Sequence, residues 1–153
     1  MNLIAESLRS KDLRLALKAT DHRDALEEVL SGFRSDARVR DWEKLRASLQ
    51  TDSANETFRE NPSAMFLHHS RTESVTGLIL AVGRSKEGLS IAGREEKIHL
   101  IFVAAMPTAM NNDYLRILGA VARVCREPSS FQELLNAEDP AGFLSVLEKG
   151  CRQ

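Results

Sequence analysis

The stretch AMFLHHSRTESVTGLILAVGRSKEGLSIAGREEKIHLIFVAAMP, residues 64–107, decides the fold that we expect. Four segments in it have the composition of β-strands: Ala64–His68, Val75–Val82, Leu89–Ala92 and Lys97–Met106. The long apolar runs are nearly continuous rather than alternating, which is typical of strands covered on both faces. Gly83 and Gly88 bracket a charged segment, RSKE, that we expect to form a hairpin, and Pro107 ends the last strand.

Helical patterns lie on both sides of this stretch. We expect the first third of the chain to be helical, with Thr20 or Asp21 as an N-cap and apolar stripes at Ala25, Leu26, Val29, Leu30, Phe33 and at Val39, Trp42, Leu45, Leu49. Residues 51–63, TDSANETFRENPS, are polar and predict a long loop. After Pro107, Asn111 or Asn112 is expected to cap a helix, and Pro128 and Pro140 open two more. The predicted fold is α/β: one domain, residues 1–153, with a mixed β-sheet flanked by helices on both sides.

The composition excludes several classes of protein. Hydrophobic residues make up 42% and charged residues 28% of the 153 residues, which is typical of a globular domain. The net charge of −1 argues against nucleic acid as a partner, although Arg34, Arg38 and Arg40 form a local basic group. Charges occur every few residues near the N-terminus, which excludes a signal-peptide core, and the longest apolar run is too short to cross a bilayer. We therefore expect a cytoplasmic protein without membrane insertion.

Metal and cofactor sites are not indicated either. Cys125 and Cys151 lie outside any CxxC or Cys/His pair, so the sequence predicts neither a zinc site nor a disulfide framework. The sequence has no Gly-rich phosphate loop, no GxSxG and no paired-carboxylate pattern, and the segment GRSKEG lacks the GK[ST] of a P-loop. We predict that the protein uses no metal and no cofactor.

The pair His68–His69 is the only concentration of nucleophilic or metal-binding side chains in the sequence. It lies where the apolar strand AMFL ends, and ligand groups of α/β sheets collect at the carboxyl ends of strands. Because successive side chains of a strand point to opposite faces, we expect the two rings to have different roles and not to share a metal. A purely structural histidine pair is the alternative. We expect His22, at a helix start, to be exposed and His99 to be structural.

Phosphoryl transfer is a chemistry that suits one histidine. The imidazole is a nitrogen nucleophile that is largely neutral at pH 7. Attack needs a lone pair on one ring nitrogen, while the other nitrogen donates its hydrogen to an acceptor. The transition state is loose and anionic, so hydroxyls, backbone N–H groups and arginines stabilise it. Groups of this kind are available at Ser70, Arg71 and Thr72 and in the polar segment at Thr57 and Arg59.

The order of these features resembles the type-2 enzyme IIA family of the phosphotransferase system, which includes fructose, mannitol and nitrogen-regulatory IIA domains. In that family an apolar strand ends in Pro-His, and a strand with a central Gly, a Gly-bounded hairpin and an apolar strand ending near Ala-Pro follow, as in residues 64–107. The segment YLRILGAVARVCREPSSFQELLNAEDPAGFLSVL, residues 114–147, is similar to the family's helical tail, and DLRLALKATDHRDALEEVLSGF, residues 12–33, matches its first helix. The resemblance spans nearly the whole chain.

The resemblance implies that His69 accepts a phosphoryl group from the histidine-containing phosphocarrier protein. It further implies that side chains around His69 support that group, namely Thr57, Ser70, Arg71, Tyr114 and His68. The acceptor would be an enzyme IIB domain, or there would be none in relatives that regulate a kinase or transporter by binding. The sequence departs from the family pattern at two of these positions: His68 replaces the usual Pro, and Tyr114 occupies the place of a second histidine. The polar segment 51–63 also replaces the family's Arg-Glu and Gly-rich loop.

Two hypotheses follow from the sequence. The first is a phosphocarrier, and thus a phosphotransferase component, that carries phosphate on His69. The second is a IIA-like regulatory module that acts by protein–protein binding without phosphoryl transfer. An unrelated small-molecule-binding domain is a third, because a fold does not by itself establish a chemistry.

Overall fold

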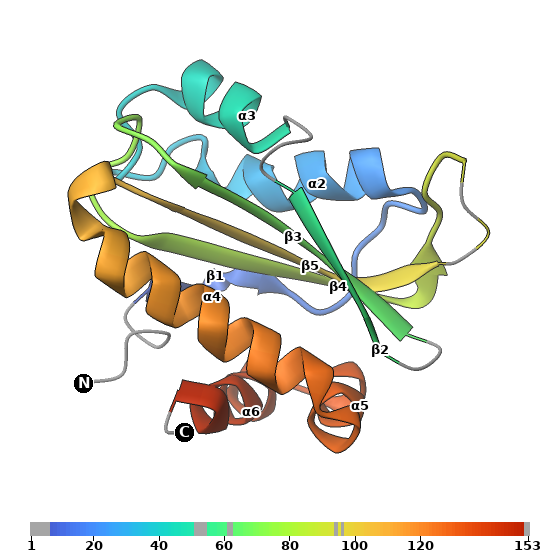
Figure 1. Cartoon of the computed structure of the whole chain (residues 1–153). Coiled ribbons are helices and arrows are strands. Elements are labelled where there is room, and N and C mark those ends of the chain that lie inside the picture. Colours follow the sequence, from blue (N-terminus) through green and yellow to red (C-terminus); the bar gives the residue numbers. More distant parts are fainter. Residues whose placement is uncertain (1–6, 51–54, 61–62, 94, 96, 152–153) are drawn as a thin grey trace.

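A twisted five-stranded sheet forms the centre of the structure, a computed structural model that describes residues 7–50, 55–60, 63–93, 95 and 97–151 (Figure 1). The spatial order of its strands is β1 (Leu8–Arg14), β4 (Ile79–Leu89), β5 (Ile98–Met106), β3 (Ser63–Arg71) and β2 (Asn55–Glu60). β1 is parallel to β4 and β3 to β5, whereas β4 and β5, and β2 and β3, are antiparallel. The sheet is therefore mixed, as predicted.

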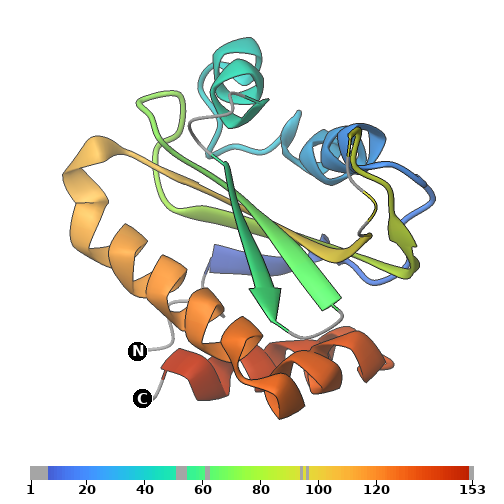
Figure 2. The same cartoon turned by 45° about the vertical axis from the view of Figure 1, so that its right-hand side comes forward.

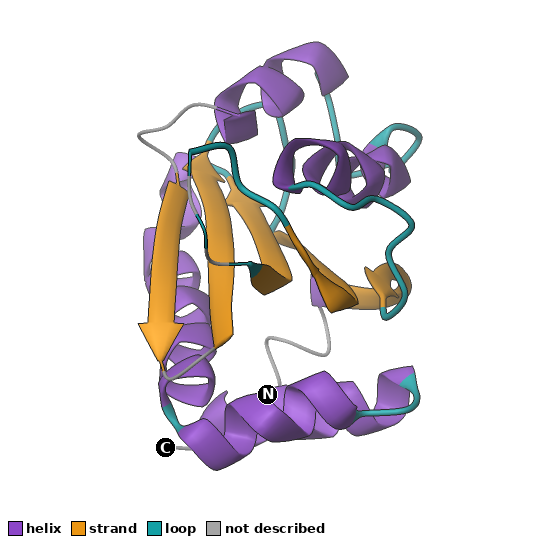
Figure 3. Ribbon diagram, turned by 90° about the vertical axis from the view of Figure 1, so that its right-hand side faces the viewer, coloured by secondary structure: helices purple, strands orange, loops and turns teal. Residues whose placement is uncertain are grey.

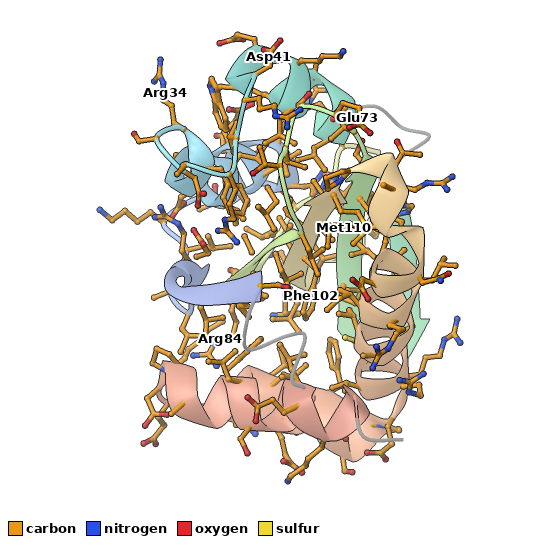
Figure 4. The ribbon with its side chains drawn as sticks, turned by 90° about the vertical axis from the view of Figure 1, so that its left-hand side faces the viewer. Arg34, Asp41, Glu73, Arg84, Phe102 and Met110 are labelled. Atoms are coloured by element: carbon orange, nitrogen blue, oxygen red, sulfur yellow. The ribbon has the colours of Figure 1, made fainter. Side chains whose placement is uncertain are left out.

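Helices cover both faces of this sheet (Figures 1 and 3). One face packs against α2 (His22–Leu30) and α3 (Trp42–Gln50), and the other against α4 (Asn111–Arg126), α5 (Pro128–Asn136) and α6 (Pro140–Cys151). Each face has its own hydrophobic core. Along β5, Phe102 (labelled in Figure 4) belongs to the core under α4–α6. Ile101 belongs to the core under α2 and α3, and both residues are fully buried. This two-sided burial explains why the central strands are continuously apolar.

The helix boundaries follow the sequence signals with one exception. Asp21 is the N-cap of α2 and accepts a hydrogen bond from the Asp24 backbone N–H, as expected. α5 and α6 begin at Pro128 and Pro140. The expectation that Asn111 or Asn112 caps α4 was wrong, because Asn111 is already the first helical residue and the helix lacks a side-chain cap.

The sequence pattern did not predict either of the two edge strands. The first third of the chain is not entirely helical, since residues 8–14 form β1, and the predicted loop at 51–63 contains β2 within it (Figure 2). An edge strand has only one neighbour and tolerates charged residues, so LRSKDLR and NETFRE lack the apolar signature of a buried strand. Ser63, also predicted in this loop, is the first residue of β3, and residues 51–54 and 61–62 lie outside the described part of the chain.

The predicted RSKE hairpin is also wrong, because these residues continue β4. The strand begins at Ile79 rather than Val75 and runs through Gly83 and Gly88 to Leu89, with a register shift against β5 between Arg84 and Leu89. Leu89–Ala92 is therefore no separate strand. The hairpin was predicted because charged residues are usually exposed, whereas Arg84 is buried (2% exposed).

Arg84 can be buried because three backbone carbonyls accept hydrogen bonds from its guanidinium. Its Nε donates to the Leu15 carbonyl (3.1 Å), and its Nη1 donates to the carbonyls of Leu134 (2.9 Å) and Ala137 (2.6 Å) at the end of α5. Figure 4 shows Arg84 on the side of the sheet that faces the C-terminal helices. A positive charge is favourable at a helix C-terminus, where carbonyls lack intrahelical partners. Arg84 thus joins β4, the exit of β1 and α5.

Gly83 gives the first stability prediction. A Cβ at this position would lie 2.6 Å from Val29 Cγ2 and 2.9 Å from Leu17 Cδ1, closer than side chains pack, so Gly83→Ala pushes α2 away from the sheet. We expect a loss of about 1–3 kcal/mol in the free energy of unfolding, measured by urea titration. Gly77→Ala is the matched control, because no heavy atom lies within 4 Å of its Cβ position. Equal losses in the two variants would contradict the prediction.

Candidate functional site

The candidate site lies at the edge where β3 and β5 end together. These strands are parallel, and Met106, the last residue of β5, aligns with Arg71, the last residue of β3. The chain then turns at Pro107 and enters α4, whose first turns return along the same edge. The Glu73 carboxylate holds the two connections together, since it accepts a hydrogen bond from the Thr108 backbone N–H (3.0 Å). This layout brings the start of α4 to the end of β3.

His69 and Tyr114 meet at this edge. His69 is half-buried near the end of β3, and its Nδ1 is hydrogen-bonded to the hydroxyl of Tyr114 in α4. The ring centroids are 5.7 Å apart and the planes are inclined by 57°, so the two rings are tilted and not stacked. Tyr114 is 4% exposed and belongs to the core under α4. The phenol is therefore a fixed partner for one nitrogen of His69.

This contact defines two states of the His69 imidazole. If Nδ1–H donates to the phenol oxygen, Nε2 carries the lone pair and is the nucleophilic nitrogen. If the phenol O–H donates to Nδ1, a neutral ring carries its hydrogen on Nε2 and cannot attack through it. The Nε2 atom is buried in the structure. The direction of the His69–Tyr114 hydrogen bond, together with access to Nε2, thus controls nucleophilicity at this site.

The other predicted site residues lie at different distances from His69. Arg71 lies two residues further along β3, and because side chains alternate along a strand it is on the same face as His69. The Arg71 side chain is exposed. Ser70 lies between these two residues and alternates to the opposite face. Thr57 aligns with Phe66 in the β2–β3 pairing, three positions before His69, and its side chain lies outside the described part of the structure.

His68 faces the opposite side of the sheet, as the alternation predicted. It is 1% exposed, its Nδ1 is 3.1 Å from the Leu49 carbonyl oxygen, and its Nε2 is 2.7 Å from Nε2 of His22. Burial, and to a smaller extent the neighbouring His22, lowers the pKa of His68 to about 3, although the hydrogen bond to the Leu49 carbonyl opposes the shift. The expectation that His22 is simply solvent-exposed was wrong: it is half-buried against His68 and Phe66. No sequence signal connects these residues, because the contact joins segments 46 positions apart.

The remaining candidates have structural partners. His99 Nδ1 is 3.0 Å from the Ser85 carbonyl oxygen, in line with the expected structural role. Arg38 is bound by the Asp36 carboxylate at 2.8 Å and lies 3.6 Å from that of Asp12, so it is not part of a basic surface group. Among the residues that the structure describes, no three His, Cys, Asp or Glu side chains are placed to hold a metal ion. Within the same residues, no helix has the length and hydrophobicity needed to cross a membrane.

The burial of His68 gives a prediction for pH. The unfolded chain binds a proton on this histidine below a pKa of about 6.5, whereas the folded protein does so only near pH 3. The unfolded state therefore binds more protons in this window, and stability falls as the pH is lowered through it. We expect His68 to account for a loss of about 2 kcal/mol between about pH 7 and pH 5. Urea titrations at both pH values test this, and His68→Phe should remove that part of the slope; an unchanged slope would refute the assignment.

These features define a class of protein: an α/β domain that presents one histidine at the end of a strand. Comparison with known proteins gives the family. Residues 6–150 match the family model "Phosphoenolpyruvate-dependent sugar phosphotransferase system, EIIA 2". The chain belongs to this family, which confirms the resemblance seen in the sequence. It is thus a type-2 enzyme IIA domain of the phosphotransferase system.

Individual relatives are distant in sequence. The chain is 22% identical over 148 residues to the PTS system fructose-specific EIIABC component of Bacillus subtilis (strain 168), covering 95% of this chain and 23% of that protein. It is 31% identical over 80 residues to the PTS system fructose-specific EIIA component of Haloferax volcanii, covering 52% of each protein. The chain therefore spans about a quarter of the length of the first relative and about half of the second.

Solved structures share the fold. The nitrogen regulatory protein IIA-Ntr from Neisseria meningitidis superimposes with a TM-score of 0.81 at 17% identity, covering 95% of this chain and 99% of that one. Enzyme IIAMTL of Escherichia coli, solved in complex with phosphorylated enzyme IIBMTL, superimposes with a TM-score of 0.70 at 13% identity, covering 93% and 99%. At these identities the likeness concerns the fold.

Proposed function

We propose that this domain accepts a phosphoryl group on Nε2 of His69 from the histidine-containing phosphocarrier protein. The observation that carries the proposal is the Tyr114 hydroxyl at Nδ1 of His69. It gives Nδ1 a fixed partner and so holds the ring in one orientation, which favours nucleophilic attack through Nε2. His68 is a poorer acceptor, because both of its nitrogens have partners within the protein and it is 1% exposed.

The transfer step conserves charge and atoms in a simple way. The Nε2 lone pair of His69 forms a bond to phosphorus while the bond from phosphorus to the donor's imidazole nitrogen breaks, and that nitrogen keeps the electron pair. The hydrogen on Nδ1 stays in the bond to Tyr114, which fixes the ring during attack. We propose that Arg71, on the same face at the end of β3, offsets the negative charge of the phosphoryl oxygens. Thr57 and Ser70 are proposed to contribute through hydroxyl or backbone groups.

The surface beside this site suits docking of another protein. Leu115 directly follows Tyr114, and 55% of its surface is accessible to solvent. Among the residues that the structure describes, it is the one large hydrophobic side chain that is exposed. Met110 is half-buried at the start of the same helix. An enzyme IIB domain is the acceptor that we propose, by analogy with the complex of enzyme IIAMTL and phosphorylated enzyme IIBMTL. We further propose that the protein acts in the cytoplasm, where the phosphocarrier protein would be its donor.

A reconstituted phosphorylation tests the proposal. The protein is incubated with phosphoenolpyruvate, enzyme I and the phosphocarrier protein, and intact-mass spectrometry follows the addition of one phosphoryl group. We expect a single addition that is lost in acid and retained in base, as for a phosphohistidine. No addition with any cognate donor would refute the carrier function.

A second function is favoured by a different observation. Nε2 of His69 is buried, and Tyr114 stands where the family usually has a second histidine. In this alternative the domain binds a kinase, a transporter or another partner without taking up phosphate. Binding that is unchanged by His69→Gln, together with the absence of phosphorylation, distinguishes the alternative from the phosphocarrier.

A further inference from the structure

His22, which is half-buried, and His68, which is buried, form a pair directly behind the candidate site. Their rings are stacked, with centroids 4.9 Å apart and planes inclined by 14°, and the ring of Phe66 packs against both. His22 is the first residue of α2, and His68 precedes His69 in β3. The pair therefore joins the layer of α2 and α3 to the strand that carries the proposed phosphoryl acceptor.

The hydrogen bonds determine where the hydrogens of this pair lie. The Leu49 carbonyl can only accept, so Nδ1 of His68 carries a hydrogen and donates it (3.1 Å). The low pKa of His68 keeps its ring neutral, which leaves a lone pair on Nε2. Nε2 of His22, 2.7 Å away, must then carry the hydrogen that joins the rings. A single hydrogen thus lies between the two Nε2 atoms.

The same pair constrains His69 through the backbone. His68 and His69 align with Val103 and Ala104 of β5, and their side chains leave the strand on opposite faces. One face is held by the contacts of His68 with His22 and Leu49, and the other by the contact of His69 with Tyr114. A displacement of His68 therefore rotates the strand end and changes the direction in which His69 leaves it.

We propose that His22 and His68 are positioning residues that hold His69 against Tyr114 while they share one hydrogen, and that a further proton releases this hold. The inference rests on the proposed function of His69. A further proton on Nε2 of His68 leaves both Nε2 atoms with hydrogens, and the hydrogen bond becomes a repulsion between two donors. His22 has room to move, because a cavity of about 790 Å³ borders both histidines.

The charged groups around the pair do not neutralise the positive charge that a further proton would bring. Arg23, Asp24 and Glu27 of α2 and Arg46 of α3 line the same cavity, and their formal charges cancel. Glu27 and Arg46 form an ion pair at 2.7 Å. Asp21 favours a positive charge on His22, but its carboxylate is exposed and accepts the Asp24 backbone N–H. On the other face, the His69 ring disfavours a positive charge on His68.

Two substitutions of His22 separate positioning from simple packing. His22→Gln keeps an N–H donor for Nε2 of His68, whereas His22→Leu fills similar space without a donor. With the phosphocarrier protein as phosphoryl donor, we expect His22→Leu to lower the maximal rate of His69 phosphorylation about tenfold with little change in the KM for the donor. His22→Gln should retain most of the rate, and its rate should decline less at acidic pH than that of the wild type, because the side-chain amide can turn its oxygen toward a protonated His68. His99→Gln, at another half-buried histidine, should behave as wild type.

Nuclear magnetic resonance of the imidazole nitrogens provides a test that does not depend on phosphorylation. We expect His68 in its Nδ1–H form in the wild type, and a change of the His69 nitrogen shifts in His22→Leu but not in His22→Gln. If these shifts change as expected while no variant is phosphorylated, the proposed function fails and the positioning stands. If His69 shifts and rates stay unchanged in His22→Leu, or if Leu and Gln lower the rate equally, the positioning role is refuted.

Discussion

His69→Gln is expected to take up no phosphoryl group from the histidine-containing phosphocarrier protein, whereas the wild-type protein takes up one. Gln places an amide where the imidazole lies, so the side chain keeps a hydrogen-bonding group for Tyr114 but has no nitrogen lone pair that attacks phosphorus. Because covalent transfer depends on this one nucleophile, we expect a loss of at least about a thousandfold in rate. Intact-mass spectrometry and the release of the phosphoryl group in acid measure the outcome.

The control for this experiment is another histidine of the same chain. His99→Gln alters an imidazole that contacts the Ser85 carbonyl and lies on a different strand from His69, so it should be phosphorylated at the wild-type rate. Circular dichroism of both variants checks that they remain folded. Phosphorylation of His69→Gln at the wild-type level would show that another residue is the acceptor, and the assignment of His69 would then be wrong.

Arg84→Met is expected to cause the largest loss of stability, about 3–5 kcal/mol in the free energy of unfolding. Met retains most of the aliphatic volume but leaves the carbonyls of Leu15, Leu134 and Ala137 without the hydrogen bonds that the guanidinium gives them. Each buried carbonyl left without a partner costs about 1–3 kcal/mol. The loss is a large part of the stability of a domain of this size, which is about 5–15 kcal/mol.

Urea titration with circular dichroism measures this loss. Lys86→Met is the matched control, because Lys86 is an exposed cation two residues further along β4 and its replacement should change stability by less than about 0.5 kcal/mol. Since Arg84 joins β4 to α5, hydrogen exchange should accelerate most in α5. A stability of Arg84→Met equal to that of Lys86→Met would show that the buried guanidinium contributes nothing net.

The central part of the fold could be predicted from the sequence because its signals are local. β5 is an unbroken apolar run, and burial on both faces produces such a run wherever a strand lies in the middle of an α/β sheet. The same reasoning placed His69 at the carboxyl end of a strand. The helix starts at Asp21, Pro128 and Pro140 were correct because a cap or a proline acts on its nearest neighbours in the chain.

The features that were missed depend on contacts between distant segments. Arg84 looks like a hairpin residue until the end of α5 supplies acceptors for it, 50 and 53 positions later. His22 looks like an exposed helix start until β3 places His68 beside it. β1 and β2 are polar because each pairs on one side only. The local sequence around a charged residue therefore does not show whether a residue far along the chain will bind it and allow its burial.

The pairing of β1 with β4 has a consequence for how the chain assembles. Leu8 aligns with Leu80, about 70 residues later, so β1 leaves the ribosome with no strand to join until β4 has been synthesised. β4 and β5, by contrast, are antiparallel and follow each other in the chain, so only a short loop has to close before they pair. We expect nascent chains to form this central hairpin first and to add β1 last. Until then the β1-binding edge of β4 stays open to other unpaired strands, and chaperone capture of the nascent chain should be strongest in that interval.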